Sequence, residues 1–146
     1  MKLAVSNIAW KEQHDEAVYA LMRHYGFTGL EIAPTRFFPE VPYSHLIPMQ
    51  KLAARLREHG FTLPSMQSLL AGHPELRLFE GTEKREALFA YLKQAVLFAE
   101  AGGIRNLVFG SPKNRISHDE KDWETAIDFF LSLIHISEPT RPRLIS

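Results

Sequence analysis

The feature that most constrains the fold of this chain is a regular alternation between short strand-like runs and longer helix-like stretches. Runs compatible with β-strands occur at residues 3–6, 30–33, 62–67 and 106–109. After each run, apolar residues recur at helical spacing, within residues 17–25, 47–56, 88–99 and 123–130. Successive strand-then-helix units of this kind predict an α/β fold with a parallel sheet.

Two further patterns favour a barrel over an open sheet. Residues 25–28 (Tyr-Gly-Phe-Thr) and 59–62 (His-Gly-Phe-Thr) form a faint repeat at the point where a helix ends and the next strand begins. The strand-to-helix links at residues 34–45 and 68–81 are long, and barrel enzymes build their sites from these links. An open doubly wound sheet is the alternative, but no G-x-G-x-x-G turn follows the first strand.

The predicted fold is therefore a partial (β/α)₈ TIM barrel consisting of the first four β-α units. A complete barrel usually takes about 250 residues and has eight units, whereas this chain has 146 residues. A half-barrel exposes the edge of its last strand and part of the apolar faces of its helices. We therefore expect a marginally stable fragment or a homo-oligomer.

The last residues do not continue the pattern. From Leu131 the sequence reads LSLIHISEPTR, then three further residues and a final Ile-Ser. This segment resembles the conceptual translation of a transposon-based sequencing adapter. We therefore divide the chain into residues 1–130, the N-terminal half of a barrel, and residues 131–146, an artefactual or disordered tail. The hypothesis predicts that the nucleotide sequence of the tail is adapter sequence.

Composition excludes several functional classes. Lys plus Arg equal Asp plus Glu at 17 each, so the chain lacks the basic field that nucleic-acid binding needs. It contains no cysteine, which excludes disulfides, a thiolate nucleophile and sulfur-based zinc sites. The apolar stretch at the N-terminus is too short for a secretory signal or a membrane span. We expect a cytoplasmic protein with no membrane partner.

Glu31 is the first candidate for a site residue. In the run Leu30-Glu31-Ile32 the side chains alternate, so Glu31 points into the barrel if its two neighbours pack under the helices. Glutamate is seldom buried without a partner, so Glu31 is either a site residue or a member of a structural ion pair. Candidate ion-pair partners follow the ends of strands and are Arg36, Lys113 and Arg115.

Other candidates lie in the loops that follow the strands. The turn after the fourth strand offers Lys113, Asn114 and Arg115 to an anionic or polyhydroxylated ligand, although such turns are also common without function. His73, in the long third loop, could donate to a sugar hydroxyl or be an ordinary surface histidine. Gln67 could bind substrate hydroxyls or close a turn, and Trp10 could stack on a sugar or pack in a lid.

Three segments carry a family resemblance. They are residues 6–10 (Ser-Asn-Ile-Ala-Trp), 26–32 (Gly-Phe-Thr-Gly-Leu-Glu-Ile) and 109–115 (Phe-Gly-Ser-Pro-Lys-Asn-Arg). Together they resemble the sugar phosphate isomerase/epimerase family of xylose-isomerase-like barrels, over residues 1 to about 130. The resemblance implies a sugar or sugar phosphate as substrate, carbohydrate metabolism as context, and proton transfer through an enediolate.

The same resemblance implies a divalent metal, manganese, magnesium or cobalt, in the full-length enzyme. In that family the metal ligands and catalytic acids lie on strands five to eight, so catalytic residues are unknown here and no metal ligand is assigned. The fragment would supply substrate-facing residues and would be inactive alone. Two alternatives stay open, an AP-endonuclease-like phosphodiesterase and a noncatalytic sugar-binding barrel.

Overall fold

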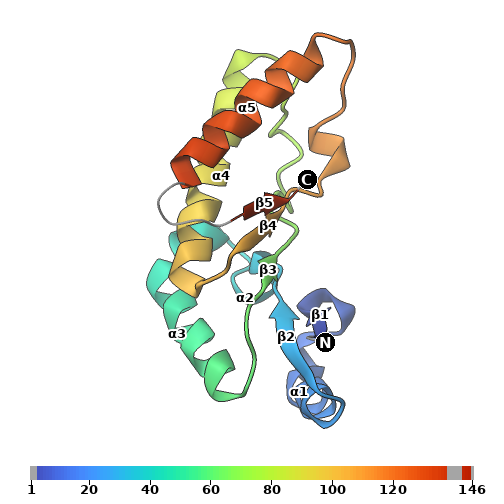
Figure 1. Ribbon diagram of the computed structural model, residues 1–146, viewed down its shortest axis with the longest axis vertical. Coiled ribbons are helices and arrows are strands. Elements are labelled where there is room, and N and C mark those ends of the chain that lie inside the picture. The colour runs from blue at the N-terminus through green and yellow to red at the C-terminus, as the bar shows by residue number, and fades with distance from the viewer. Residues whose placement is uncertain (1–2, 138–142, 146) are drawn as a thin grey trace.

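The structure is a computed structural model that describes residues 3–137 and 143–145 (Figure 1). In this part of the chain the strands are β1 (Leu3–Ser6), β2 (Phe27–Glu31), β3 (Ser65–Met66), β4 (Asn106–Val108) and β5 (Arg143–Ile145). The helices are α1 (Asp15–His24), α2 (Pro34–Phe37), α3 (Leu46–Glu58), α4 (Thr82–Gly102) and α5 (Asp122–Ser137). Short 3₁₀ turns lie after β1 (Asn7–Ala9), before α1 (Glu12–His14), between α2 and α3 (Pro42–Ser44) and after β4 (Pro112–Asn114).

All strand pairs are parallel, and the strands follow one another in chain order. β1 pairs with β2, and β3 pairs with β4, which pairs with β5. Single parallel bridges, Gly29 to Thr62 and Ile32 to Met66, connect β2 to the β3 segment. A doubly wound sheet would reverse its strand order at a switch point, and none occurs here among the described strands.

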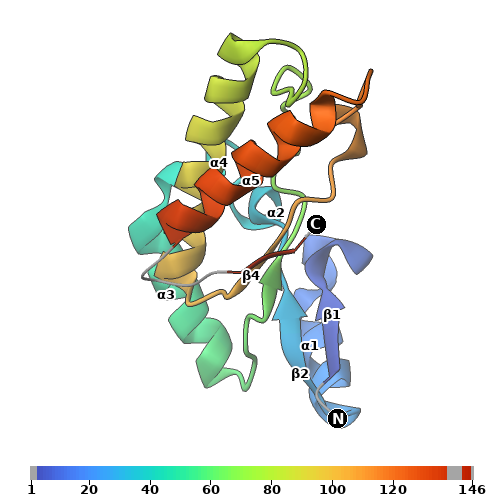
Figure 2. The same cartoon turned by 45° about the horizontal axis from the view of Figure 1, so that its top comes forward.

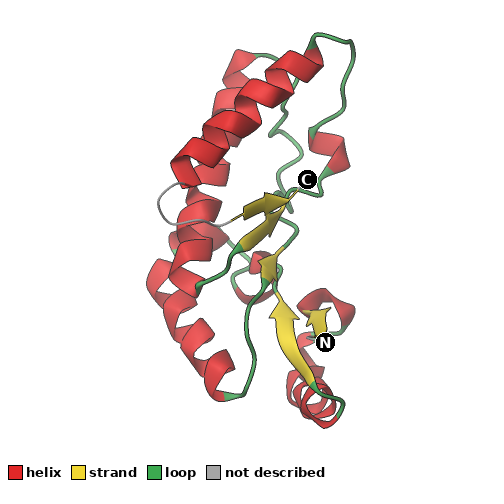
Figure 3. Cartoon of the chain, viewed as in Figure 1, coloured by secondary structure: helices red, strands yellow, loops and turns green. Residues whose placement is uncertain are grey.

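The position of the helices also favours a partial barrel over a doubly wound sheet. In both orientations α3 and α4 lie along the same side of the strands (Figures 1 and 2), and the strands form a row beside the helix layer (Figure 3). Sequential parallel strands with their crossover helices on one side are the arrangement of a (β/α)₈ barrel. The described chain is therefore a partial barrel, as the sequence predicts. None of its described helices has the length and apolar character needed to cross a bilayer.

The boundaries of several elements differ from the sequence prediction. β3 covers Ser65–Met66 rather than residues 62–67, and β4 ends at Val108 rather than at residue 109. β2 covers Phe27–Glu31 rather than residues 30–33, because it pairs with β1 from Leu3 onward. The fourth long helix, α5, continues to Ser137 rather than ending near Phe130. Leu133 is buried one turn after buried Phe129, so the apolar face continues past the predicted end. β5 places residues 143–145 beside β4, whereas residues 138–142 and 146 lie outside the described part. The origin of the tail stays a prediction.

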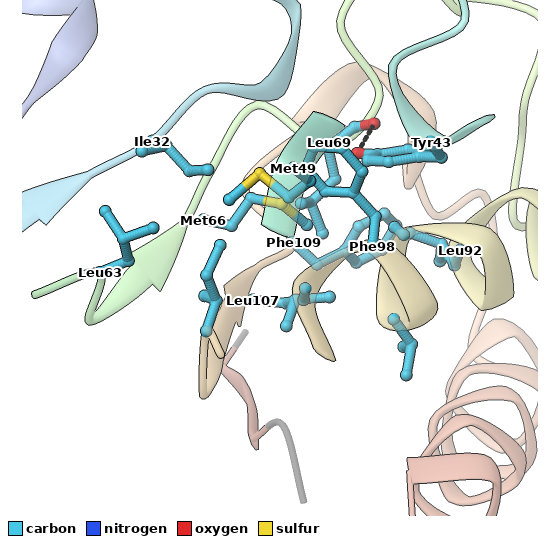
Figure 4. Close-up of a cluster of buried hydrophobic side chains, with 14 of the residues drawn as sticks. Ile32, Tyr43, Met49, Leu63, Met66, Leu69, Leu92, Phe98, Leu107 and Phe109 are labelled. Atoms are coloured by element: carbon cyan, nitrogen blue, oxygen red, sulfur yellow. Dashed lines mark hydrogen bonds between the residues drawn. The ribbon is translucent and has the colours of Figure 1, made fainter. Parts of the chain in front are cut away.

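The hydrophobic core lies between the strands and the helix layer (Figure 4). Strand residues Leu30, Ile32, Met66 and Leu107 are fully or nearly fully buried against it. Helices α3 and α4 cover them with large side chains such as Met49, Leu92 and Phe98. Burial of each of these side chains removes apolar surface from water, at roughly 25 cal/mol per Å².

The loop between α2 and α3 packs against this core. The Tyr43 ring contacts the rings of Tyr91 and Phe98, and its hydroxyl donates to the carbonyl of Leu69 at 2.8 Å. Burial raises the pKa of Tyr43 well above its ordinary value, so the hydroxyl stays a donor at physiological pH. Phe38 contacts Phe98 from the same loop. The aromatic residues of this loop therefore belong to the core rather than to a lid over a ligand.

The close approach of β1 and β2 depends on a glycine. Ala4 pairs with Gly29 in the parallel register, and a Cβ atom added at Gly29 would lie 2.6 Å from the Cβ of Ala4. That distance is far inside van der Waals contact, so a larger residue here must push the two strands apart. Gly29 is thus required by packing and not by an unusual backbone conformation.

We predict that Gly29→Ala destabilises the fold by about 1–3 kcal/mol because the new methyl group overpacks the β1–β2 contact. Urea denaturation followed by circular dichroism measures this change. Gly110→Ala is the matched control, since a Cβ there finds its nearest neighbour at 3.7 Å. Ala4→Gly in the Gly29→Ala background should recover part of the loss, and equal stability of the two single variants would contradict the argument.

Candidate functional site

A row of polar side chains lies on the face of the sheet that points away from the helices. Leu30 and Ile32 are buried in the core, so Glu31 between them faces the opposite side. By the same alternation Ser65 and Gln67 flank buried Met66, and Ser6 follows Val5, which packs on the core. In a barrel this face is the interior, and these residues stand at or near the carboxyl ends of β1, β2 and β3.

Hydrogen bonds across the strands hold this row in place. Ser65 Oγ donates to Glu31 Oε1 at 2.7 Å, which links β3 to β2. Gln67 Nε2 donates to Ser6 Oγ at 2.5 Å, which links the end of β3 to β1. Ser68 Oγ makes a longer contact, 3.5 Å, to Gln67 Oε1. The carboxylate and the amide are therefore held by neutral hydroxyl groups in fixed orientations.

None of the three candidate ion-pair partners pairs with Glu31 in the described part of the chain. Arg36 Nη2 instead pairs with Asp15 Oδ1 at 2.7 Å, and within the described residues no ion pair joins Glu31 to Lys113 or Arg115. Glu31 is half-buried, and among the described residues only its Oε1 atom has a hydrogen-bond partner. A carboxylate without a counter-ion and with one oxygen unengaged is suited to accept a hydrogen bond from a ligand hydroxyl.

A pocket of about 300 Å³ opens where β3 and β4 end. Gln67 and Ser68 line it from the β3 side, and Val108, Gly110 and Ser111 line it from the β4 side. This volume is at the lower limit of small-molecule pockets. Gln67 is the residue that connects the pocket to the polar row, because its amide also contacts Ser6.

Trp10 lies in a separate cluster near the start of α1. Its indole Nε1 donates to Asp15 Oδ1 at 2.7 Å, and the same carboxylate oxygen receives Arg36. The Trp10 ring meets the Tyr19 ring edge-on, with centroids 6.3 Å apart. Trp10 is half-buried and has its polar atom engaged, so the structure joins it to α1 and α2 rather than to Glu31.

His73 and Asn114 fasten the long third loop to the fourth. Asn114 is buried, and its Nδ2 donates to the carbonyls of His73 and Leu76 at 2.8 and 2.7 Å. In return, the backbone nitrogen of Leu78 donates to the Asn114 carbonyl at 2.9 Å. Both amide hydrogens of Asn114 are thus engaged within the protein. The predicted role of Asn114 in substrate binding stays a prediction, but its contacts assign it a structural role.

The ring of His73 is held from two sides. It stacks at an angle on Tyr91, and its Nδ1 lies 2.8 Å from Glu75 Oε1. The pKa of Glu75 is lowered, first by a hydrogen bond from its own backbone and then by the one to His73. His73 is half-exposed, and among the described residues no hydrogen bond or ring contact joins it to Glu31 or Gln67.

The remaining two sequence candidates point elsewhere. Lys113 is exposed, and its carbonyl accepts a hydrogen bond from Arg77 Nη1. The Arg115 guanidinium lies over the Phe109 ring, 5.9 Å from the centroid, and lines an apolar groove beside α5. The structure therefore places Glu31 and Gln67 on the same face of neighbouring strands, each hydrogen-bonded to its own serine. The other sequence candidates, which are Trp10, His73, Lys113, Asn114 and Arg115, make their contacts elsewhere.

The sequence analysis missed Ser6, Asn7 and Ser65 as members of the site. Asn7 is only 1% exposed; its Oδ1 accepts the Ala33 backbone N–H at 2.8 Å. Asn7 Nδ2 is buried and has no hydrogen-bond partner among the described residues. The available signal was position, since a polar residue directly after a predicted strand faces the open end of a barrel.

The described residues do not by themselves fit a metal site. Within residues 3–137 and 143–145, no three side chains of the His, Asp, Glu or Cys types come together at one point. Divalent metals in proteins are commonly held by three or more such ligands. Glu31 is the one carboxylate on the polar row described above, and its hydrogen-bond partner is a serine.

The sequence matches no protein-family model and no curated protein. Solved structures do match. A sugar phosphate isomerase/epimerase from Parabacteroides distasonis superposes with a TM-score of 0.69 at 16% identity, over 98% of this chain and 49% of that chain. D-psicose 3-epimerase from Clostridium cellulolyticum, solved with D-tagatose, superposes with a TM-score of 0.71 at 18% identity, over 99% and 51%.

A third similar structure is the IOLI protein, solved with a zinc atom. It superposes with a TM-score of 0.64 at 16% identity, over 99% of this chain and 50% of that chain. The chain thus spans about half the length of the structures it matches. At these identities the likeness establishes the fold, a partial barrel of the kind found in sugar isomerases and epimerases.

We predict that Asn114→Asp loosens the third loop, because a carboxylate cannot donate to the carbonyls of His73 and Leu76. Each lost buried hydrogen bond costs about 1–3 kcal/mol. Hydrogen–deuterium exchange should rise over residues 68–81 while the protection of α3 is retained. Gln94→Glu, an exposed amide-to-acid change on α4, is the matched control. Unchanged exchange in the loop would show that Asn114 does not fasten it.

Proposed function

We propose that this chain forms the first half of a sugar or sugar phosphate isomerase/epimerase of the xylose-isomerase-like family. The observation that carries the proposal is the polar row on the inner face of the sheet, in which Ser65 holds Glu31 and Ser6 holds Gln67. Solved epimerases and isomerases of the same fold support the general kind of activity. The reaction class proposed is proton transfer next to a sugar carbonyl, through an enediolate.

In this proposal the residues of the described chain bind and orient the sugar. Glu31 accepts a hydrogen bond from a sugar hydroxyl through the oxygen that Ser65 does not engage. Gln67, at the rim of the pocket, offers an amide that accepts and donates. Ser65 and Ser6 fix the two side chains, which lowers the entropy lost when a ligand binds. Glu31 is a binding residue here and is not assigned as the general base.

A divalent metal would supply polarisation of the sugar oxygens in the full-length enzyme. Because the described residues do not form a metal site, its ligands would come from chain beyond those residues. No chemical step is therefore assigned to this half. The zinc atom bound in the IOLI structure supports the presence of a metal in related barrels.

A noncatalytic sugar-binding barrel is the second candidate. It is favoured by one observation, that among the described residues Glu31 has no other titratable side chain in its hydrogen-bond network. Proton abstraction on one side of a sugar and return on the other need a pair of such groups. Binding alone needs only the carboxylate and amide described above, so the test must separate binding from turnover.

We predict that the 146-residue chain binds a ketose such as D-tagatose weakly, with NMR shift changes at Gln67, Ser68 and Gly110. Glu31→Gln should reduce the affinity several-fold, because the amide replaces a charged acceptor by a neutral one. The change keeps side-chain size, so thermal stability should stay close to that of the parent. Glu58→Gln, an exposed change on α3, is the control. Loss of stability with unchanged affinity would assign Glu31 to the fold alone.

We also predict that this chain does not catalyse the reaction, even with added manganese or magnesium. Incorporation of deuterium from solvent at the carbon beside the ketose carbonyl gives the most sensitive measurement. No incorporation is expected, because proton transfer needs groups that the described residues do not bring to Glu31. Measurable exchange that disappears in Glu31→Gln would contradict the assignment and make Glu31 a catalytic base.

A further inference from the structure

The pocket at the ends of β3 and β4 is lined without any charged side chain. In the described part of the chain its polar lining consists of Gln67, Ser68 and Ser111, and the other lining residues are aliphatic or glycine. Hydroxyl and amide groups both donate and accept hydrogen bonds, as the hydroxyl groups of a sugar do. This lining is therefore matched to a polyhydroxylated molecule that carries no charge.

A carboxylate lies beside this pocket on the inner face of the sheet. Gln67 Nε2 donates to Ser6 Oγ, and Ser6 is the register partner of Glu31 in the β1–β2 pair. Neighbouring strands lie about 4.8 Å apart, so Ser6 and Glu31 are adjacent on this face. Ser65 engages one oxygen of the Glu31 carboxylate. A ligand that extends from the pocket toward β1 and β2 therefore meets a negative charge.

The cations that follow the strands are directed elsewhere. Arg36 forms its ion pair with α1, and its side chain is only 14% exposed. The Arg115 guanidinium lies over the Phe109 ring and lines the groove beside α5. Lys113 is exposed on the turn after β4. In the described part of the chain, none of these three cations lines the pocket or pairs with Glu31.

A phosphate ester is poorly matched to this surface for two reasons. The oxygens of a phosphate dianion accept hydrogen bonds and do not donate them, and the Glu31 oxygen that Ser65 does not engage also only accepts. The ester also carries a charge of about −1.5 to −2 at pH 7, which a carboxylate repels. A sugar hydroxyl, by contrast, donates to the same oxygen. The surface therefore favours the free sugar and disfavours the ester.

We propose that this half of the site selects an uncharged sugar over its phosphate ester, and that Glu31 determines this specificity. The selection rests on the proposed function of sugar binding, and it narrows the substrate class from sugars and sugar phosphates to uncharged sugars. Gln67 and Ser68 contribute neutral groups that bind hydroxyls in the pocket. Glu31 contributes the charge that excludes an anionic group from the neighbouring part of the inner face.

NMR titration of the 146-residue chain with D-tagatose and with D-tagatose 6-phosphate measures the selection at Gln67, Ser68 and Gly110. At low ionic strength the free ketose should bind about fivefold or more tightly than the ester, because the two negative charges are weakly screened. In Glu31→Gln the ratio of the two affinities should fall toward one. Glu58→Gln, which removes an exposed carboxylate on α3, is the matched control and should keep the wild-type ratio.

The sign of the salt dependence gives an independent readout. The chain carries 17 basic and 17 acidic residues, so added salt acts on ligand binding through the local field and not through a net charge. Between about 0.02 M and about 0.5 M salt the Debye length falls from about 20 Å to about 4 Å. Binding of the ester should tighten over this range, and binding of the free ketose should stay constant. In Glu31→Gln the tightening should disappear.

Other results would overturn the selection and leave the proposed function intact. They are an ester that binds more tightly than the ketose, ester binding that weakens as salt is added, and an affinity ratio that Glu31→Gln does not change. Loss of ester affinity in Lys113→Gln or Arg115→Gln would also overturn it, because that loss would assign the phosphate to the turn after β4. If neither sugar binds, the proposed function fails and the selection fails with it.

Discussion

The structure depends on the alternation of side chains along its parallel strands. In β2 the residues Leu30 and Ile32 enter the core under α3 and α4, which forces Glu31 to the other face. The close β1–β2 contact at Gly29 fixes the register in which this alternation is read. A shift by one residue would bury the carboxylate and expose two large apolar side chains, so the register is strongly determined.

The same alternation makes one face of the sheet apolar and the other polar. The outer face carries the apolar side chains that hold α3 and α4, and most of the buried residues of the chain belong to this layer. The inner face carries hydroxyl, amide and carboxylate groups that bond across strands. Loops at the carboxyl ends are then fastened by buried polar groups, Tyr43 on one side and Asn114 on the other. A rigid scaffold with polar groups at the strand ends is what a sugar site needs.

A partial barrel also has ends, and the ends explain the exposed apolar surface. Helix α4 packs between α3 and α5 in the described part of the chain, whereas α1 and α5 stand at its two ends. Their outward flanks, at Leu21 and at Trp123 with Ile127, stay in contact with water. In a closed barrel each helix packs against a helix on either side, which explains why these flanks are apolar.

The sequence by itself determined the order of strands and helices, because periods of two and of 3.6 residues are properties of the local chain. It also determined the inward direction of Glu31, which follows from Leu30 and Ile32 on either side. It could not determine what Glu31 bonds to, since Ser65 lies in another unit, or that Arg36 turns to Asp15 instead. The sequence pattern placed the end of α5 too early, because the burial of Leu133 depends on tertiary packing. Only the tertiary structure separated Glu31 and Gln67 from the other candidates, because convergence of side chains from different strands is set by sheet register and loop packing.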